Sequence, residues 1–249
     1  MSGHSKWSKI KRSKAANDAK RGKEWSKIAR RIIVAAKAGG GNPAENLQLR
    51  YAIDEAKGAN MPNDTVNNAI KKGTGELGSA QYEEIMYEGY GSGGVAVLCE
   101  CLTDNRNRTA PEMRKIFESA GGHLGNTGCV AWMFDQKGAF SVAADVTDED
   151  ALMEVALEAG ADDVVLDEDT FEVTCEVSAF AALKQALADA GIETVAAAIS
   201  QVPKSTVAVT DPHKAQSVLR LMDALDNHED VQNAYSNFDI PEEILAELQ

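Results

Sequence analysis

The sequence has no long apolar run. Nothing in its 249 residues approaches the roughly 18 consecutive apolar residues of a membrane-spanning helix, so no membrane partner is expected. The first thirty residues hold a basic stretch with no apolar core behind it, which argues against a secretory signal. A basic, acid-poor start is also typical of organellar transit peptides, but here MSGHSKW leads directly into structured-looking sequence. We therefore expect a cytoplasmic protein.

Cysteine is scarce. Cys99 and Cys101 are spaced to share one face of an expected strand, and Cys129 and Cys175 stand apart. A tetrahedral zinc site needs four ligands, and neither a second close cysteine pair nor a histidine cluster supplies them. We expect four small buried thiols in a reducing compartment, and no metal.

Catalytic motifs are missing too. The chain has no P-loop, no H-E-x-x-H motif and no G-x-S-x-G turn. The segment GYGSGG, residues 89–94, matches G-x-G-x-x-G but precedes the expected strand 95–102, whereas a dinucleotide site needs glycines between a strand and a helix. The four histidines lie in unrelated segments. The sequence predicts a protein that is not an enzyme and needs no cofactor.

What the chain does have is an uneven distribution of charge. Residues 1–80 carry 16 Lys and Arg against 7 Asp and Glu, whereas residues 81–249 carry 9 against 32. The first part is therefore net +9 and the rest net −23, within a total of −14. Such a division indicates separate functions for the two parts, and the basic part is the candidate for binding a polyanion.

The basic part is predicted to be a helical nucleic-acid-binding domain, residues 1–80. Apolar residues recur at helical spacing from Trp25 to Ala36, and further helices are expected from Pro43, in the first turn, to Gly58 and from Val66 to Gly73. Lysines and arginines neutralise phosphates, and tryptophan stacks on bases or packs in a core. The predicted nucleic-acid-binding residues are Lys6, Trp7, Lys9, Lys11, Arg12, Lys14, Lys20, Arg21, Lys23, Lys27, Arg30 and Arg31. A solvated basic face is the alternative.

The remainder predicts an α+β fold. Strands are expected at 94–103, 129–134, 205–210 and 231–238, with helices after the first, where Thr109 and Glu112 form a capping box, and after the third. Residues 136–204 contain a complete β-α-β-β-α-β series, the ferredoxin-like order.

Two domain arrangements fit this order. In one, residues 81–135 and 205–249 form a discontinuous ferredoxin-like domain, and the ferredoxin-like domain 136–204 is inserted in it. In the other, three modules follow in series. We favour the insertion, because an isolated β-α-β half would leave apolar strand faces uncovered. The expected fold is thus an N-terminal helical domain followed by two ferredoxin-like domains, one inserted in the other.

A second candidate site lies in the acidic part. Arg106 and Arg108 follow an expected strand at the start of a helix, where free backbone N–H groups favour anions. With Gly91, Gly93 and Gly94 they form a candidate anion or RNA loop. The alternative is a capped turn with two solvent-exposed arginines.

Four segments together resemble the YebC/PmpR family: GHSKW (3–7), KAANDAKRGKEWSKIAR (14–30), YEGYGSGGVAVLCECLTDNRNRT (87–109) and GGHLGNTGCVAWMF (121–134). The chain departs from the family pattern at Ser92, where proline is expected, and at Cys129, where serine is expected. The resemblance covers essentially the whole chain and implies a cytoplasmic three-domain protein without enzymatic activity.

The resemblance leaves two functions open. Bacterial members are described as DNA-binding transcriptional regulators and mitochondrial relatives as translational activators of cytochrome c oxidase, which implies a non-enzymatic, nucleic-acid-binding regulator of gene expression. Members are also linked to the ribosome, where they help synthesis of proline-rich stretches, so the alternative is a translation factor that binds ribosomal RNA. The oligomeric state stays open.

Overall fold

The computed structural model describes residues 18–78, 81–167 and 169–248. These residues fall into two compact units. One unit contains residues 132–207 and 235–239, and the other contains the described residues of 9–131, 208–234 and 240–249. No helix among the described residues is long and apolar enough to cross a membrane.

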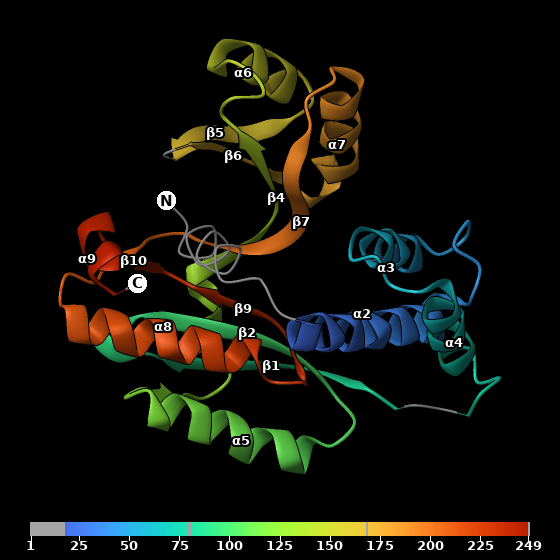
Figure 1. Cartoon of the computed structure of the whole chain (residues 1–249), viewed down its shortest axis with the longest axis horizontal. Helices are drawn as coiled ribbons and strands as arrows, with labels where there is room; N and C mark the ends of the chain where they lie inside the picture. The colour runs from blue at the N-terminus through green and yellow to red at the C-terminus, as the bar shows by residue number, and fades with distance from the viewer. Residues whose placement is uncertain (1–17, 79–80, 168, 249) are drawn as a thin grey trace. The chain divides into compact units, whose positions relative to one another are not determined.

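The basic part is helical, as predicted. It contains α2 (Asp18–Gly39), α3 (Leu47–Gly58) and α4 (Asn63–Gly73), and both α3 and α4 pack against α2 (Figure 1). Ile28, Ile32 and Leu49 are fully buried at the centre of their shared core. The apolar spacing seen in the sequence is therefore the packing stripe of the helices.

The junction between α2 and α3 depends on Asn46, and α3 begins at Leu47 instead of at Pro43 as expected. The Asn46 Oδ1 accepts a hydrogen bond from the Leu49 backbone N–H at 3.1 Å, which caps α3. Its Nδ2 donates to the carbonyls of Ala35 at 2.7 Å and Gly40 at 2.9 Å. One buried amide thus satisfies backbone groups of both helices.

A four-stranded sheet follows in the order β3-β1-β2-β9. Its strands are β1 (Glu83–Tyr90), β2 (Ala96–Thr103), β3 (His123–Leu124) and β9 (Val231–Ser236). The helices α5 (Arg106–Ser119) and α8 (Pro212–Asp226) contact each other (Figure 1). The fold class, an α+β protein with a helical region before its sheets, is as the sequence predicts.

Two expected strands of this part were wrong, and one strand was missed. Residues 129–134 contain a 3-10 turn, η2 (Ala131–Met133), because the backbone N–H groups of Val130 and Ala131 donate to the Glu88 carboxylate instead of to a strand. Of residues 205–210 only β8 (Val207–Ala208) is a strand, in a separate two-stranded sheet with β10 (Phe238–Asp239). The missed strand β1 pairs antiparallel with β2 along its full length.

The helix after β2 also begins earlier than expected. Its N-cap is Asn105, whose side chain accepts from the Arg108 N–H at 3.1 Å, so the expected capping box at Thr109 and Glu112 was wrong. Thr109 lies in the second turn instead, where its buried hydroxyl bonds to Thr103 Oγ1 at 2.8 Å.

The unit formed by residues 132–207 and 235–239 contains the β-α-β-β-α-β series that the sequence predicts. Its elements are β4 (Phe134–Ala143), α6 (Glu149–Glu158), β5 (Ala161–Asp167), β6 (Thr170–Glu176), α7 (Phe180–Asp189) and β7 (Thr194–Pro203). The strands are antiparallel in the order β5-β6-β4-β7, which is the ferredoxin-like arrangement. The fully buried Val142, Leu152 and Leu183 lie in its core.

The remaining elements are short. They are η1 (Ser92–Gly94), η3 (Val177–Ala179) and α9 (Glu242–Glu247). The domain boundaries 1–80, 81–135 with 205–249, and 136–204 stay a prediction.

Replacing Asn46 by alanine tests the α2–α3 junction. The variant loses the cap of α3 and the bonds from the buried amide to the Ala35 and Gly40 carbonyls, so the free energy of unfolding should fall by about 1–3 kcal/mol. Urea denaturation followed by circular dichroism measures this change. The control is Asn67→Ala, an exposed position of α4, which should change the free energy by less than about 0.5 kcal/mol. Equal effects in both variants would contradict the assigned role.

Candidate nucleic-acid interface

Half of the predicted nucleic-acid-binding residues lie outside the described part of the chain. These are Lys6, Trp7, Lys9, Lys11, Arg12 and Lys14. The backbone of Lys20 and Arg21 belongs to α2, whereas their side chains are outside the description. Trp25, which the sequence places in the core stripe, donates from its Nε1 to the Ala59 carbonyl at 2.9 Å.

Three of the predicted residues contact the end of α8 and the turn that follows it. Lys27 Nζ donates to the Asp226 carbonyl at 2.7 Å, and Lys23 Nζ to the Asn227 carbonyl at 3.4 Å. Arg30 donates to the Glu229 carbonyl and, at 3.1 Å, to the Asp230 carboxylate. Because a helix C-terminus carries partial negative charge and unpaired carbonyls, cations from α2 are well placed there. Their predicted contacts with nucleic acid stay a prediction.

The fourth, Arg31, pairs with the Glu55 carboxylate of α3 at 2.7 Å. Burial raises the pKa of Glu55, and the charge of Arg31 opposes that rise. Arg31 therefore contributes to holding α2 against α3.

Asp230 is the centre of the contacts between α2, α5 and β9. Its side chain is 2% exposed. One carboxylate oxygen accepts from Arg30, and the other accepts from Arg108 Nη2 and from Thr109 Oγ1, both at 2.8 Å. Burial would raise the pKa of Asp230, but the hydrogen bonds and the charges of both arginines outweigh it and lower that pKa. The carboxylate is thus held ionised between two helices.

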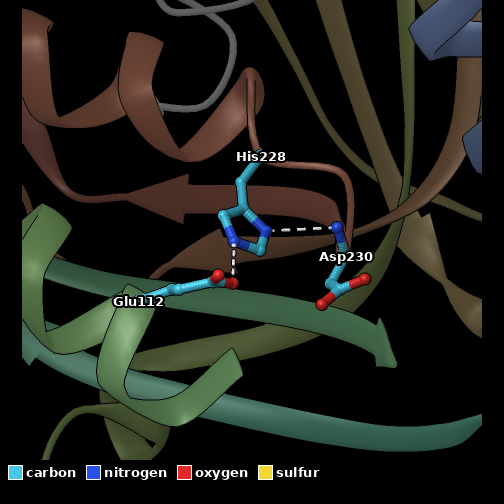
Figure 2. Close-up of side chains that lie close together, drawn as sticks. All are labelled: Glu112, His228 and Asp230. Carbon is cyan, nitrogen blue, oxygen red and sulfur yellow. Dashed lines mark hydrogen bonds and ion pairs between the residues drawn. The ribbon is translucent and has the colours of Figure 1, made fainter. Parts of the chain in front are cut away.

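His228 extends this cluster, as Figure 2 shows. Its Nδ1 accepts from the Asp230 backbone N–H at 3.1 Å, so its Nε2 carries the proton and donates to Glu112 Oε2 at 3.0 Å. A neutral imidazole satisfies both contacts.

Among the described residues, one group has three potential metal ligands close together, namely Glu112, His228 and Asp230. The fit is poor, because both ring nitrogens of His228 have partners and Asp230 accepts bonds from two arginines. A divalent cation would have to displace these contacts and approach two guanidinium groups. The arrangement is suited to holding α2, α5 and β9 together.

The candidate anion loop does not come together as one site. Arg106 is the exposed first residue of α5. Arg108 forms ion pairs with Asp230 at 2.8 Å and with Asp104 at 3.3 Å. The loop with Gly93 and Gly94 lies at the opposite end of α5, where Ser92 Oγ donates to the Ala120 carbonyl at 3.4 Å. The helix between them has 14 residues, or about 21 Å.

The loop before β4 is organised by Glu88, which the sequence did not indicate. This carboxylate is 3% exposed and accepts from the backbone N–H groups of Gly128 at 2.6 Å and of Val130 and Ala131, each at 2.8 Å. Burial would raise the pKa of Glu88, but these three bonds outweigh it and lower that pKa. Tyr90 adds a bond from its hydroxyl to the Cys129 carbonyl at 3.1 Å.

Known proteins match the chain along nearly its whole length. The family description "TACO1/YebC protein N-terminal domain" matches residues 5–76, and "TACO1/YebC second and third domain" matches residues 82–238. The chain belongs to the TACO1/YebC family. The resemblance seen in the sequence motifs is thereby confirmed.

Individual members of the TACO1/YebC family are similar over full length. "Probable transcriptional regulatory protein DP2908" of Desulfotalea psychrophila is 54% identical over 248 residues, which cover 100% of this chain and 99% of that protein. "Probable transcriptional regulatory protein GSU1074" of Geobacter sulfurreducens is 52% identical over 248 residues, and the match covers 100% of this chain and 100% of that protein. The crystal structure of the "Conserved Hypothetical Protein Aq1575" from Aquifex aeolicus has a TM-score of 0.83 at 46% identity, and the match covers 92% of this chain and 94% of that one.

Replacing Asp230 by asparagine should weaken the contact of α2 with α5 and with the turn before β9. The variant removes a buried charge and leaves Arg30 and Arg108 without their counter-charge, so the free energy of unfolding should fall by about 3 kcal/mol. Hydrogen exchange at residues 22–31 should accelerate more than exchange in β6. The control is Glu229→Gln in the same turn, where the carboxylate is 78% exposed and the expected loss is under about 1 kcal/mol. Unchanged exchange in α2 would contradict the role given to Asp230.

The Glu88→Gln variant tests the role of Glu88 in this loop, because its effect on stability should depend on pH. The native pKa of Glu88 is lowered, so its stabilisation is fully present above the ordinary carboxyl pKa and is lost as the pH falls through the lower native value. The variant should be less stable near neutral pH, and the difference from wild type should shrink on acidification from about pH 6 to about pH 3. Urea titrations across this range measure it. A difference that stays constant with pH would contradict the assignment.

Proposed function

We propose that this chain is a non-enzymatic regulator of gene expression that binds nucleic acid through its basic N-terminal part, residues 1–80. The observation that carries the proposal is the concentration of 12 Lys and Arg against 2 Asp and Glu in the first 37 residues of a chain whose total charge is −14. The names of the family members, "Probable transcriptional regulatory protein", support a regulatory role.

The distribution of charge supports contact with nucleic acid at the basic part alone. Residues 81–249 carry a net charge of −23 and repel phosphates, so nucleic acid would be confined to the basic part. The cytoplasm is the proposed compartment.

The contacts of α2 divide the predicted cations into two groups. Lys27 and Arg30 bind the end of α8 and the turn after it, and Arg31 binds Glu55. We assign primary phosphate contact to residues nearer the N-terminus: Lys6, Lys9, Lys11, Arg12, Lys14, Lys20 and Arg21. The others hold α2, which carries this segment, on the protein.

Two kinds of nucleic acid fit this proposal. Duplex DNA is favoured by the names of the relatives, and a regulator of transcription should prefer some sequences over others. Ribosomal RNA is the alternative, because lysines and arginines supply affinity for any phosphate backbone. The deciding experiment is a competition at physiological salt between purified ribosomes and excess mixed genomic duplex DNA for labelled full-length protein. Retention on ribosomes would favour the translation role, and displacement by a subset of DNA fragments would favour transcriptional control.

Neutralising the N-terminal segment tests the proposal itself. A variant with Lys11, Arg12, Lys14, Lys20 and Arg21 replaced by alanine should bind duplex DNA or structured RNA at least tenfold more weakly near 0.15 M salt. The slope of log affinity against log salt, near −5 if about six phosphates are engaged on duplex DNA, should flatten. The thermal midpoint should stay close to that of wild type.

A control variant changes the net charge by the same amount elsewhere. It replaces five exposed cations of residues 81–249 by alanine, namely Arg114, Lys115, Lys184, Lys204 and Arg220. This control should bind only slightly more weakly than wild type, because it adds long-range repulsion but removes no phosphate contact. Equal loss in both variants would show that net charge alone decides binding, and no loss in the N-terminal variant would refute the assignment.

A further inference from the structure

The outer face of α4 is polar and basic. Val66 and Ala69 are buried against α2 and α3, and Ile70 is half-buried beside them. The opposite face presents Asn67, Asn68, Lys71 and Lys72, which are all exposed. The spacing of three and four residues places these side chains next to one another along the helix.

Lys37 of α2 joins this face, because the last turns of α2 and α4 are in contact. A Cβ added at Gly73 would lie 2.5 Å from the Ile33 carbonyl oxygen and 2.6 Å from the Ala36 Cβ. Only glycine permits so close an approach of the two helices. The exposed Lys37 follows Ala36 directly, and Lys71 and Lys72 directly precede Gly73, so all three lysines lie within two residues of this contact in the sequence.

These three lysines differ from the other described cations of the helical part except Arg50, an exposed residue of α3. Within the described residues of 18–78, Lys23, Lys27 and Arg30 bind the end of α8 and the turn after it, Arg31 pairs with Glu55, and Lys57 pairs with Asp54 at 3.1 Å. No hydrogen bond or ion pair to the side chains of Lys37, Lys71 and Lys72 occurs in that same range. The nearby Glu76 accepts instead from Thr74 Oγ1 at 3.1 Å.

Complementing the helix dipole is the simplest alternative role for lysines in a last turn. That role does not need them to be unpaired or gathered on one surface. Lys57 in the last turn of α3 fulfils it while paired with Asp54. Lys57 is therefore the matched residue with which to separate the two roles.

We infer that Lys37, Lys71 and Lys72 form a second contact surface for the phosphate backbone of nucleic acid, at the opposite end of α2 from the N-terminal segment. This inference rests on the proposed function. The asparagines add amide groups, which donate to phosphate oxygens and pair with adenine edges. The 22 residues of α2 span about 33 Å, roughly one turn of duplex DNA, so the two surfaces suit a target of about ten base pairs or more.

The test uses the full-length protein with mixed-sequence duplexes of 8 and 24 base pairs, as DNA in one arm and as RNA in the other. The variant is Lys37→Gln, Lys71→Gln and Lys72→Gln together. Because this variant cannot neutralise three of the phosphates, the salt slope on 24-base-pair DNA should become less steep by about 2.7. Affinity at 0.1 M salt should fall by up to about eightfold per lysine. The 8-base-pair duplex, too short to reach both surfaces, should show a smaller loss.

Two comparisons make the outcome specific. Lys57→Gln removes a last-turn lysine from the same helical part and should leave the salt slope unchanged. Thermal midpoints of all variants should agree within a few degrees, and Lys71→Arg with Lys72→Arg should retain wild-type binding. The DNA and RNA arms show which backbone is preferred, and a loss in either arm supports the inference.

The N-terminal alanine variant separates this inference from the proposed function. Weak binding by that variant with unchanged binding by the triple glutamine variant would overturn the second surface and leave the proposed function standing. The inference would also be overturned if Lys57→Gln changed the salt slope by one-third of the change that the triple glutamine variant produces. Absence of binding by the wild-type protein to every duplex would overturn both.

Discussion

The buried carboxylate of Asp230 is the interaction on which the arrangement of α2, α5 and β9 depends. A charge that is 2% exposed is tolerated only with partners, and these come from segments about 200 and 120 residues away in the sequence. Arg30 and Arg108 supply the charge and Thr109 a further donor, while His228 accepts from the Asp230 backbone. The structure therefore joins its basic and acidic parts through an ion cluster centred on a buried carboxylate.

This cluster changes how the positive charge of the N-terminal part is understood. Lys27 and Arg30 are cations in the sequence but structural donors in the fold, where they satisfy carbonyls at the end of α8 and in the following turn. Cations that satisfy the protein's own backbone are less available to phosphate, so the density of lysine and arginine overstates the binding surface. The exposed lysines at the far ends of α2 and α4 show the opposite case, because no hydrogen bond or ion pair to their side chains occurs within the described residues of 18–78, and Glu76 accepts from Thr74.

The sequence predicted what depends on local periodicity and missed what depends on distant partners. The stripe from Trp25 to Ala36 and the β-α-β-β-α-β series were found because their apolar spacing shows their packing directly. The segment 129–134 is as apolar as a buried strand, yet its N–H groups bind Glu88, 40 residues or more away. The strand β1 was missed because three of its eight residues are glutamates. For α4, the alternation of buried Val66 and Ala69 with exposed polar residues is visible in the sequence and could have indicated Lys71 and Lys72.

The conformation of the loop bound by Glu88 does not depend on the side chains at its tip. The three bonds to the Glu88 carboxylate come from main-chain N–H groups, and the Tyr90 hydroxyl donates to a main-chain carbonyl, whereas the residues at the tip of the loop, Asn126 and Thr127, are exposed. New side chains at these two positions leave the interior bonds untouched, so one rigid loop can present many different surfaces. A spectroscopic label can thus be placed at either position without disturbing the fold.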